Sequence, residues 1–99
     1  MSIASARHMN AIAESGCAVG NRRLGKCAGR LEVHHVAEGS GERSDFATVC
    51  LCSEHHRGES GLHGMGTKAF IRLYRPPGDS EYGLLVWANE DLAKRKMVA

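Results

Sequence analysis

The chain has 99 residues and a formal net charge of +2, with 13 Lys and Arg, 11 Asp and Glu and six His. This length suits one compact domain, which we expect to span residues 1–99. No apolar run approaches the roughly 20 residues of a transmembrane helix, and the N-terminus lacks the apolar stretch of a secretory signal. The weakly basic charge is compatible with nucleic acid but does not identify it as a partner.

The four cysteines favour a metal-binding protein. Without an export signal we expect a cytoplasmic location, where reduced cysteines bind metal more often than they form disulfides. The chain has only two Phe, two Tyr and one Trp. Because the apolar core must therefore be small, a bound metal would help to hold the fold together.

The spacing of apolar residues predicts an α+β chain. Apolar positions predict a helix over residues 3–15, ended by Gly16. Residues 17–29 are rich in Gly and Arg and predict an irregular loop. The alternating run LEVHH and the apolar run FATVCLC predict two strands, separated by the turn-rich segment AEGSGERSD.

The second half of the chain is predicted to be mainly helical. Ser53 is a good N-cap, so a short helix is expected to start there and to carry the second His-His pair. The segment TKAFIRLY predicts a helix with Phe70, Leu73 and Tyr74 on one side, ending before a Pro-Pro pair. The segment EYGLLVWANEDLAKRK predicts further helix, in two pieces around Asn89.

One group of ligand-type residues predicts a structural zinc site. Cys52 and His55 have the spacing of a metal-binding knuckle, in which a short turn lets both side chains reach one ion. Cys17 and Cys27 from the preceding loop would complete a tetrahedral site. Cys50 is the alternative to Cys27, although we favour a core position for it. The competing interpretation is that these are buried apolar thiols, and the density of ligand-type residues favours zinc.

The remaining histidines of this region form a second group. If His56 and His63 meet His34, three neutral imidazoles can hold one divalent cation and leave positions open for a phosphate oxygen and water. His35 would then be free to act as a general base, because an imidazole exchanges a proton readily near neutral pH. The adjacent pair His34 and His35 would thus divide metal binding and proton transfer between them.

The order of these motifs resembles that of the HNH (His-Me finger) nucleases, which have a ββα-metal fold. The pattern GC…LEVHHV…GSGERSDFATVCLCSEHHRGESGLHG is similar to phage and prophage HNH proteins of the recombination-enhancing, RecA-dependent nuclease type. The similarity extends over roughly residues 5–87 and is strongest over 32–64. It implies a ββα-metal core at about 16–66, with helical flanks at 3–15 and 67–97.

The resemblance implies a metal-dependent DNA endonuclease, derived from a phage or prophage and linked to DNA recombination or processing. His34 and His56 match the ligands of the catalytic ion, and His35 matches the general base. His63 lies where a further ligand or a phosphate contact is expected. Asp45 is the candidate to orient the base, in place of the Asn for which the motif is named.

Other positions depart from the family pattern. Thr48 is an alternative to Asp45 as the orienting residue. Gly20 stands where relatives have the second cysteine of a Cys-x-x-Cys pair, so Cys27 would have to replace it. Cys50 stands where relatives commonly have proline.

The expected cofactors are a structural zinc and a catalytic magnesium, manganese, zinc or nickel ion, and imidazole ligands favour the transition metals, cobalt included. The expected partner is DNA, with a recombinase filament implied by resemblance alone. Glycines between the strands, Gly39 and Gly41, are either a turn or a phosphate contact. The candidate phosphate contacts are Arg43 and Arg57 beside the metal, and Arg22, Arg23, Lys26 and Arg30 in the first loop.

Two other functions compete with the nuclease. One is a zinc-stabilised DNA- or protein-binding module of the same fold without catalysis, and the other is a regulator whose histidines sense metal. The sequence leaves the oligomeric state open.

Overall fold

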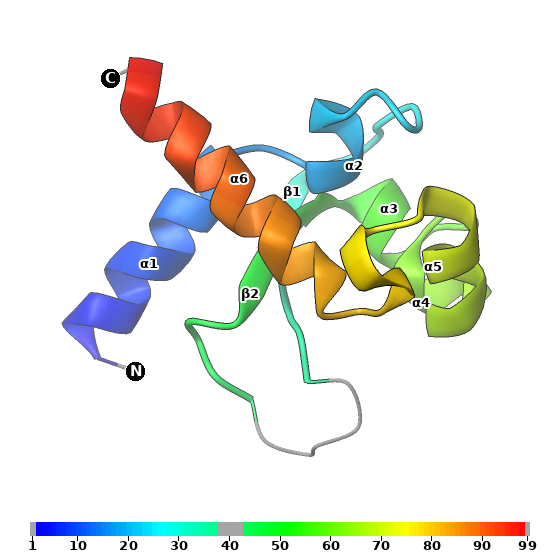
Figure 1. Ribbon diagram of the computed structural model, residues 1–99, viewed down its shortest axis with the longest axis horizontal. Helices are drawn as coiled ribbons and strands as arrows, with labels where there is room; N and C mark the ends of the chain where they lie inside the picture. The colour runs from blue at the N-terminus through cyan, green and yellow to red at the C-terminus, as the bar shows by residue number, and fades with distance from the viewer. Residues whose placement is uncertain (1, 38–42, 99) are drawn as a thin grey trace.

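The computed structural model describes residues 2–37 and 43–98. At its centre lies an antiparallel hairpin of β1 (Leu31–His35) and β2 (Thr48–Cys52), and α3 (Ser53–Arg57) follows β2 directly (Figure 1). Helices flank this ββα unit on both sides in the sequence, which confirms the predicted α+β class. These are α1 (Ile3–Glu14), α2 (Ala18–Asn21), α4 (Leu62–Met65), α5 (Thr67–Tyr74), the 3-10 turn η1 (Pro77–Asp79) and α6 (Gly83–Val98).

The register of the hairpin separates its two ends. Leu31 pairs with Cys52, and His35 pairs with Thr48. At about 3.4 Å per residue, the four steps between these pairs place His35 and Cys52 roughly 14 Å apart along the hairpin. The cysteine end and the histidine end can therefore hold separate sites.

The core forms around β2, all five residues of which are buried. Both α1 and α6 pack against this strand, and Figure 1 shows α6 crossing the hairpin diagonally. The fully buried side chains include Ile12 from α1, Val49 and Leu51 from β2, Phe70 from α5 and Leu84 from the start of α6. In the described part of the chain, no helix is both long enough and apolar enough to cross a bilayer.

The helix predicted at 3–15 is confirmed, whereas the loop predicted over 17–29 contains the short helix α2. α1 begins where it does because Ser2 and Ser5 form a reciprocal capping box. Ser53 is not the N-cap of α3. Cys52 takes that position, and its Sγ accepts from the His55 backbone N–H at 3.5 Å. The Ser53 hydroxyl instead donates to the carbonyl of Ala28.

Two expectations for the second half were wrong. Leu73 is 58% exposed, and Ile71 takes its place beside Phe70 and Tyr74 in the core. The helix predicted in two pieces around Asn89 is the single helix α6. It continues through Asn89 because no proline or glycine follows its first residue, and its buried side packs on the core through both halves.

Candidate metal centres

Three cysteines and one histidine meet at the cysteine end of the hairpin. The ligand atoms of Cys17, Cys27, Cys52 and His55 all lie within 4.8 Å of one another. His55 Nδ1 lies 3.5, 3.7 and 3.1 Å from the sulfurs of Cys17, Cys27 and Cys52. Bonds of about 2.3 Å to sulfur and 2.1 Å to nitrogen set the ligands of a tetrahedral zinc roughly 3.5–3.8 Å apart. The four side chains therefore fit a structural zinc ion.

The missing side chain of Gly20 leaves space for Cys27, so the cluster does not need a Cys-x-x-Cys pair. A Cβ atom built on Gly20 would lie 2.4 Å from the Sγ of Cys27. The sulfur of Cys27 therefore occupies the space into which a side chain at position 20 would point. Cys27 replaces, in space, the cysteine that residue 20 lacks.

Two thiols of this cluster have pKa values shifted in opposite directions: that of Cys52 is lowered, because hydrogen bonds outweigh the effect of its burial. Partial burial of the Cys27 sulfur, with hydrogen bonds to Cys52 and Cys17, raises the pKa of Cys27 to about 12. Three thiolates cannot collect at one point without a compensating positive charge. A divalent ion supplies that charge and displaces the protons.

Cys50 lies outside the cluster, in the core as favoured. Its side chain is 2% exposed, and its thiol donates to the Ala13 carbonyl at 3.8 Å. Burial raises the pKa of this thiol to about 12. Cys50 is therefore a protonated, apolar side chain.

Three histidines meet at a second point. His34 on β1, His56 on α3 and His63 on α4 place their ligand atoms within 4.8 Å of one another. Their ring centroids lie 4.8–5.4 Å apart, pair by pair. His55 and His56 are neighbours on α3, where successive side chains diverge by about 100°. One turn of helix therefore contributes a ligand to each cluster.

His63 reaches this cluster through a tight reversal between α3 and α4. A Cβ atom on Gly61 would lie 2.4 Å from the Glu54 carbonyl oxygen, and one on Gly64 would lie 1.8 Å from that of Gly58. Only glycine permits such close packing of backbone on backbone. These close backbone contacts therefore bring His63 back to His56.

The three imidazoles are suited to binding a cation. Burial, and then the neighbouring His56, His63, His35 and Arg43, lowers the pKa of His34 to about 4. Burial also lowers the pKa of His63. His34 and His63 are therefore neutral at pH 7, with lone pairs available to a metal.

Two carboxylates that the sequence interpretation missed hold the outer sides of these rings. Glu32 accepts from His56 Nδ1 at 2.7 Å, and Glu81, which is 8% exposed, lies 3.2 Å from His34 Nε2. The hydrogen bond from His56, followed by that from Arg57, lowers the pKa of Glu32. A ligand histidine commonly bonds a carboxylate through its second ring nitrogen.

The sequence contained a signal for one of the two carboxylates. Glu32 lies two residues before His34 and therefore on the same face of β1. Glu81 comes from a distant segment, and no local pattern indicates it.

His35 lies beside the histidine cluster and bonds a carboxylate of its own. Its Nε2 lies 2.8 Å from Oδ1 of Asp45, and this hydrogen bond lowers the pKa of Asp45. The alternative partner, Thr48, instead donates to the Asp45 carbonyl at 3.2 Å. Asp45 is therefore the hydrogen-bond partner of His35, and Thr48 bonds the backbone of Asp45.

The three clustered histidines and the neighbouring His35 line one pocket of about 170 Å³. Arg43 lies on its wall and brings a positive charge next to the imidazoles. The lining residues are Val33, His34, His35, Arg43, His56 and His63.

The other basic candidates differ in their surroundings. Arg22 bonds Glu90 at 2.9 Å and Asp91 at 3.1 Å and lies over the ring of Trp87, so the fold itself uses its charge. Arg57 pairs with both carboxylate oxygens of Glu32 but remains 60% exposed.

The remaining candidates in the first loop are exposed, and the glycines between the strands lie outside the described residues. The exposed cations are Arg23, Lys26 and Arg30, and the glycines are Gly39 and Gly41.

No family model matches the chain, and neither a curated protein nor a solved structure matches it.

Proposed function

We propose that this chain is a metal-dependent DNA endonuclease of the HNH type. The observation that supports the proposal is the content of one pocket. Three imidazoles converge on a single point there, and a fourth, His35, stands beside them in a hydrogen bond to Asp45. A structural metal site needs no such additional histidine–carboxylate pair.

His35 has the role of general base in this proposal. Asp45 accepts a hydrogen bond from Nε2–H and so selects the tautomer in which Nδ1 carries the lone pair. Nδ1 can then accept a proton from the water that attacks the phosphorus atom. The Asp45 carboxylate also stabilises the imidazolium formed by this transfer.

His34, His56 and His63 would hold the catalytic ion. A divalent ion held there would stabilise the negative charge that develops on the phosphate and on the leaving oxygen. Neutral imidazoles favour manganese, zinc, nickel or cobalt over magnesium. Arg43, on the wall of the same pocket, offers charged donors to a non-bridging phosphate oxygen.

The structural zinc has a positioning role in the proposal. It would tie Cys17 and Cys27 of the first loop to Cys52 and His55 at the start of α3. Because His56 follows His55 on the same helical turn, fixing one also fixes the orientation of the other. Loss of zinc would therefore disturb the catalytic pocket at a distance.

DNA is the proposed substrate, and a recombinase filament on DNA is a proposed partner. The phosphodiester chemistry of the pocket and the motif resemblance support the first, and the motif resemblance alone supports the second. A zinc-stabilised binding module is the competing function, and it would retain the cysteine cluster without turnover.

The test is a cleavage panel on plasmid, linear duplex and single-stranded DNA with added magnesium, manganese, zinc or nickel. Wild-type protein should cut at least one form. His35→Ala should reduce the rate by about 10²–10⁴-fold, the usual contribution of a general base, with the melting temperature and zinc content unchanged. Asp45→Asn should cause a smaller loss.

Glu59→Ala, an exposed change away from the pocket, serves as the control and should keep wild-type activity. Folded, metal-loaded wild-type protein that cuts no DNA with any of these ions would favour the binding module. Full activity of His35→Ala would contradict the assigned mechanism.

A further inference from the structure

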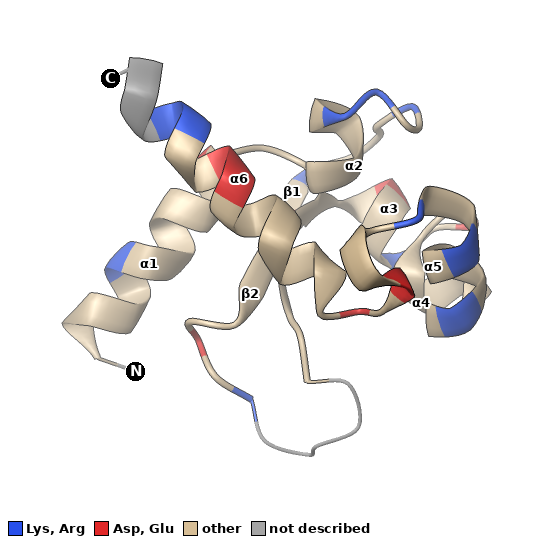
Figure 2. Ribbon diagram, viewed as in Figure 1, with Lys and Arg blue, Asp and Glu red and all other residues tan. Residues whose placement is uncertain are grey.

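Helix α5 carries a line of positive charge that the catalytic proposal does not use. Lys68 and Arg72 are four residues apart and so share one side of the helix, and Arg75 follows directly as its C-cap residue. Figure 2 shows basic positions in blue along the ribbon of α5. The helix segment TKAFIRLY contains no acidic residue.

Two of these cations have no ion-pair partner in the part of the chain that the structure describes. Arg75 pairs with Asp79 at 3.1 Å, whereas neither Lys68 nor Arg72 has an ion pair among the described residues. Both side chains are exposed. Like charges four residues apart on a helix repel each other, so α5 bears an unfavourable arrangement that an anion would relieve.

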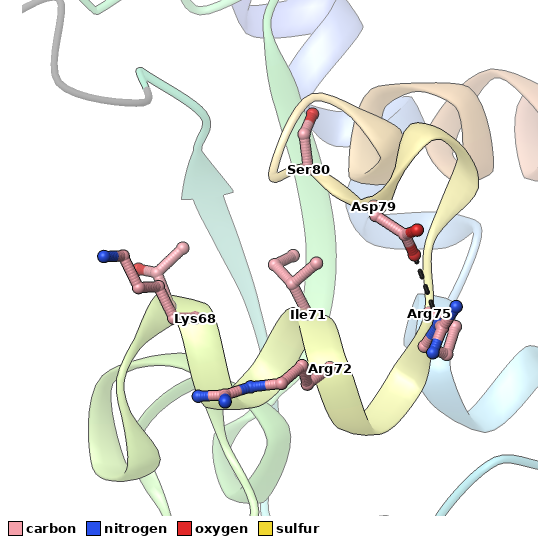
Figure 3. A pocket seen from close by; sticks show the side chains of 7 residues that line it. Lys68, Ile71, Arg72, Arg75, Asp79 and Ser80 are labelled. Atoms are coloured by element: carbon pink, nitrogen blue, oxygen red, sulfur yellow. Dashed lines mark hydrogen bonds and ion pairs between the residues drawn. The ribbon is translucent and has the colours of Figure 1, made fainter.

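The charged side of α5 borders a hollow of about 450 Å³. Figure 3 shows Lys68, Arg72 and Arg75 along the helix, with Ser80 on the facing segment and Ile71 between them. The hollow combines cationic side chains with hydroxyl donors, since Thr67 also lines it, and the lining carboxylate of Asp79 is paired with Arg75. Cations and hydroxyls are the groups that bind phosphate oxygens in protein–DNA complexes.

The position of α5 relates this surface to the histidine pocket. Thr67 follows His63 by four residues, which span at most about 14 Å. Lys68 and Arg72 are four helical steps apart, about 6 Å. Each strand of duplex DNA carries one phosphate per ~3.4 Å of helix axis. A strand placed with one phosphate at the histidines therefore has others within reach of α5.

We infer that the exposed face of α5 binds backbone phosphates of the DNA strand that flanks the cleaved bond, through Lys68 and Arg72. This inference rests on the proposed nuclease function. The contacts give affinity without sequence preference, because phosphate oxygens are the same at every step. These contacts would also extend the DNA interface, which is otherwise short in a chain of 99 residues.

The test measures equilibrium binding of a labelled duplex by fluorescence anisotropy at several salt concentrations. All proteins carry His35→Ala and their metals, so the DNA stays intact. Replacing both Lys68 and Arg72 by Ala should weaken binding and reduce the slope of log affinity against log salt by about 1.8, or 0.9 per phosphate contact. The exchange Lys68→Arg with Arg72→Lys should retain the slope.

The matched control is Lys94→Ala, an exposed cation on α6 beside Glu14 and Asp91, which should leave the slope unchanged. In the active background, the double alanine variant should hydrolyse bis(4-nitrophenyl) phosphate as fast as the parent, since this small diester does not reach α5. An unchanged salt slope in the double alanine variant would overturn the inference and leave the nuclease proposal intact.

A different pair of results distinguishes the nuclease proposal from the phosphate site on α5. A wild-type protein that cuts no DNA, while the double alanine variant still loses the expected slope, contradicts the nuclease and supports the phosphate site. Absence of any DNA binding by the His35→Ala protein would overturn both.

Discussion

Gly20 and Cys27 are two positions from which a side chain can supply the same ligand of the cysteine cluster. A Cβ atom built on Gly20 would lie 2.4 Å from the Sγ of Cys27. A cysteine at 20 and a cysteine at 27 are therefore mutually exclusive solutions for the same ligand. The backbone at Gly20 does not have a positive φ, so it accepts a side chain once Cys27 is removed.

Exchanging the two positions tests this equivalence. Cys27→Ala should lose tight zinc binding, because only three ligands remain. Adding Gly20→Cys to Cys27→Ala should restore one zinc per chain in the cysteine cluster and most of the lost melting temperature, measured by metal analysis and thermal unfolding. Leu24→Cys with Cys27→Ala keeps the cysteine count and should restore neither. Equal recovery in both double variants would contradict the geometry.

Glu81 offers a test of the histidine cluster at the level of one carboxylate. Its bond to His34 Nε2 raises the basicity of that ring towards a metal on the other side. Glu81→Gln should weaken binding of manganese to the histidine site by about 10–100-fold, as measured by calorimetry. Zinc in the cysteine cluster should remain bound. Unaltered manganese affinity would show that Glu81 has no part in the site.

At the scale of elements, the connection between α3 and α4 decides whether His63 belongs to the site. The segment from Gly58 to Gly64 folds back on itself and on α3 so closely that Gly61 and Gly64 each face backbone atoms and have no room for a side chain. The same reversal orders Ser60, whose backbone and hydroxyl both donate to Glu54. α4 is thereby held with His63 over His56.

Gly64→Ala should break this arrangement. The added methyl group would meet the Gly58 carbonyl, and overpacking of this kind costs about 1–3 kcal/mol. We expect a lower melting temperature and weaker metal binding at the histidine site, with the cysteine cluster intact. Glu59→Ala, an exposed change in the same connection, should alter neither. A wild-type response from Gly64→Ala would mean that the reversal is not needed to place His63.

The sequence predicted the elements whose signals are local. The alternation in LEVHH, the apolar run before Cys52 and the knuckle spacing to His55 each determine a strand or a turn without distant help. Glu81 was missed because its partner lies 47 residues away. Leu73 was misplaced because the packing of α5 on its neighbours, and not helical spacing alone, selects the buried side. The continuity of α6 through Asn89 likewise depends on packing against the core.

The whole molecule places two unlike sites at the two ends of one short hairpin. Cys52 and His35 are separated by the length of β1, and α3 contributes His55 to one cluster and His56 to the other. The thiol-rich set suits a closed, structural zinc, while the imidazole set lies in a pocket that leaves room for a ligand. We therefore propose that the cysteine cluster stabilises the fold and that the histidine cluster carries the chemistry.

A cobalt titration followed by optical absorption tests the claim most directly. Wild-type protein should bind two ions per chain, one with thiolate-to-cobalt charge-transfer bands and one with only the weaker bands of nitrogen and oxygen ligands. His56→Ala should lose the second ion and keep the first. A single ion per chain in wild-type protein, or loss of the charge-transfer bands in His56→Ala, would contradict two separate centres.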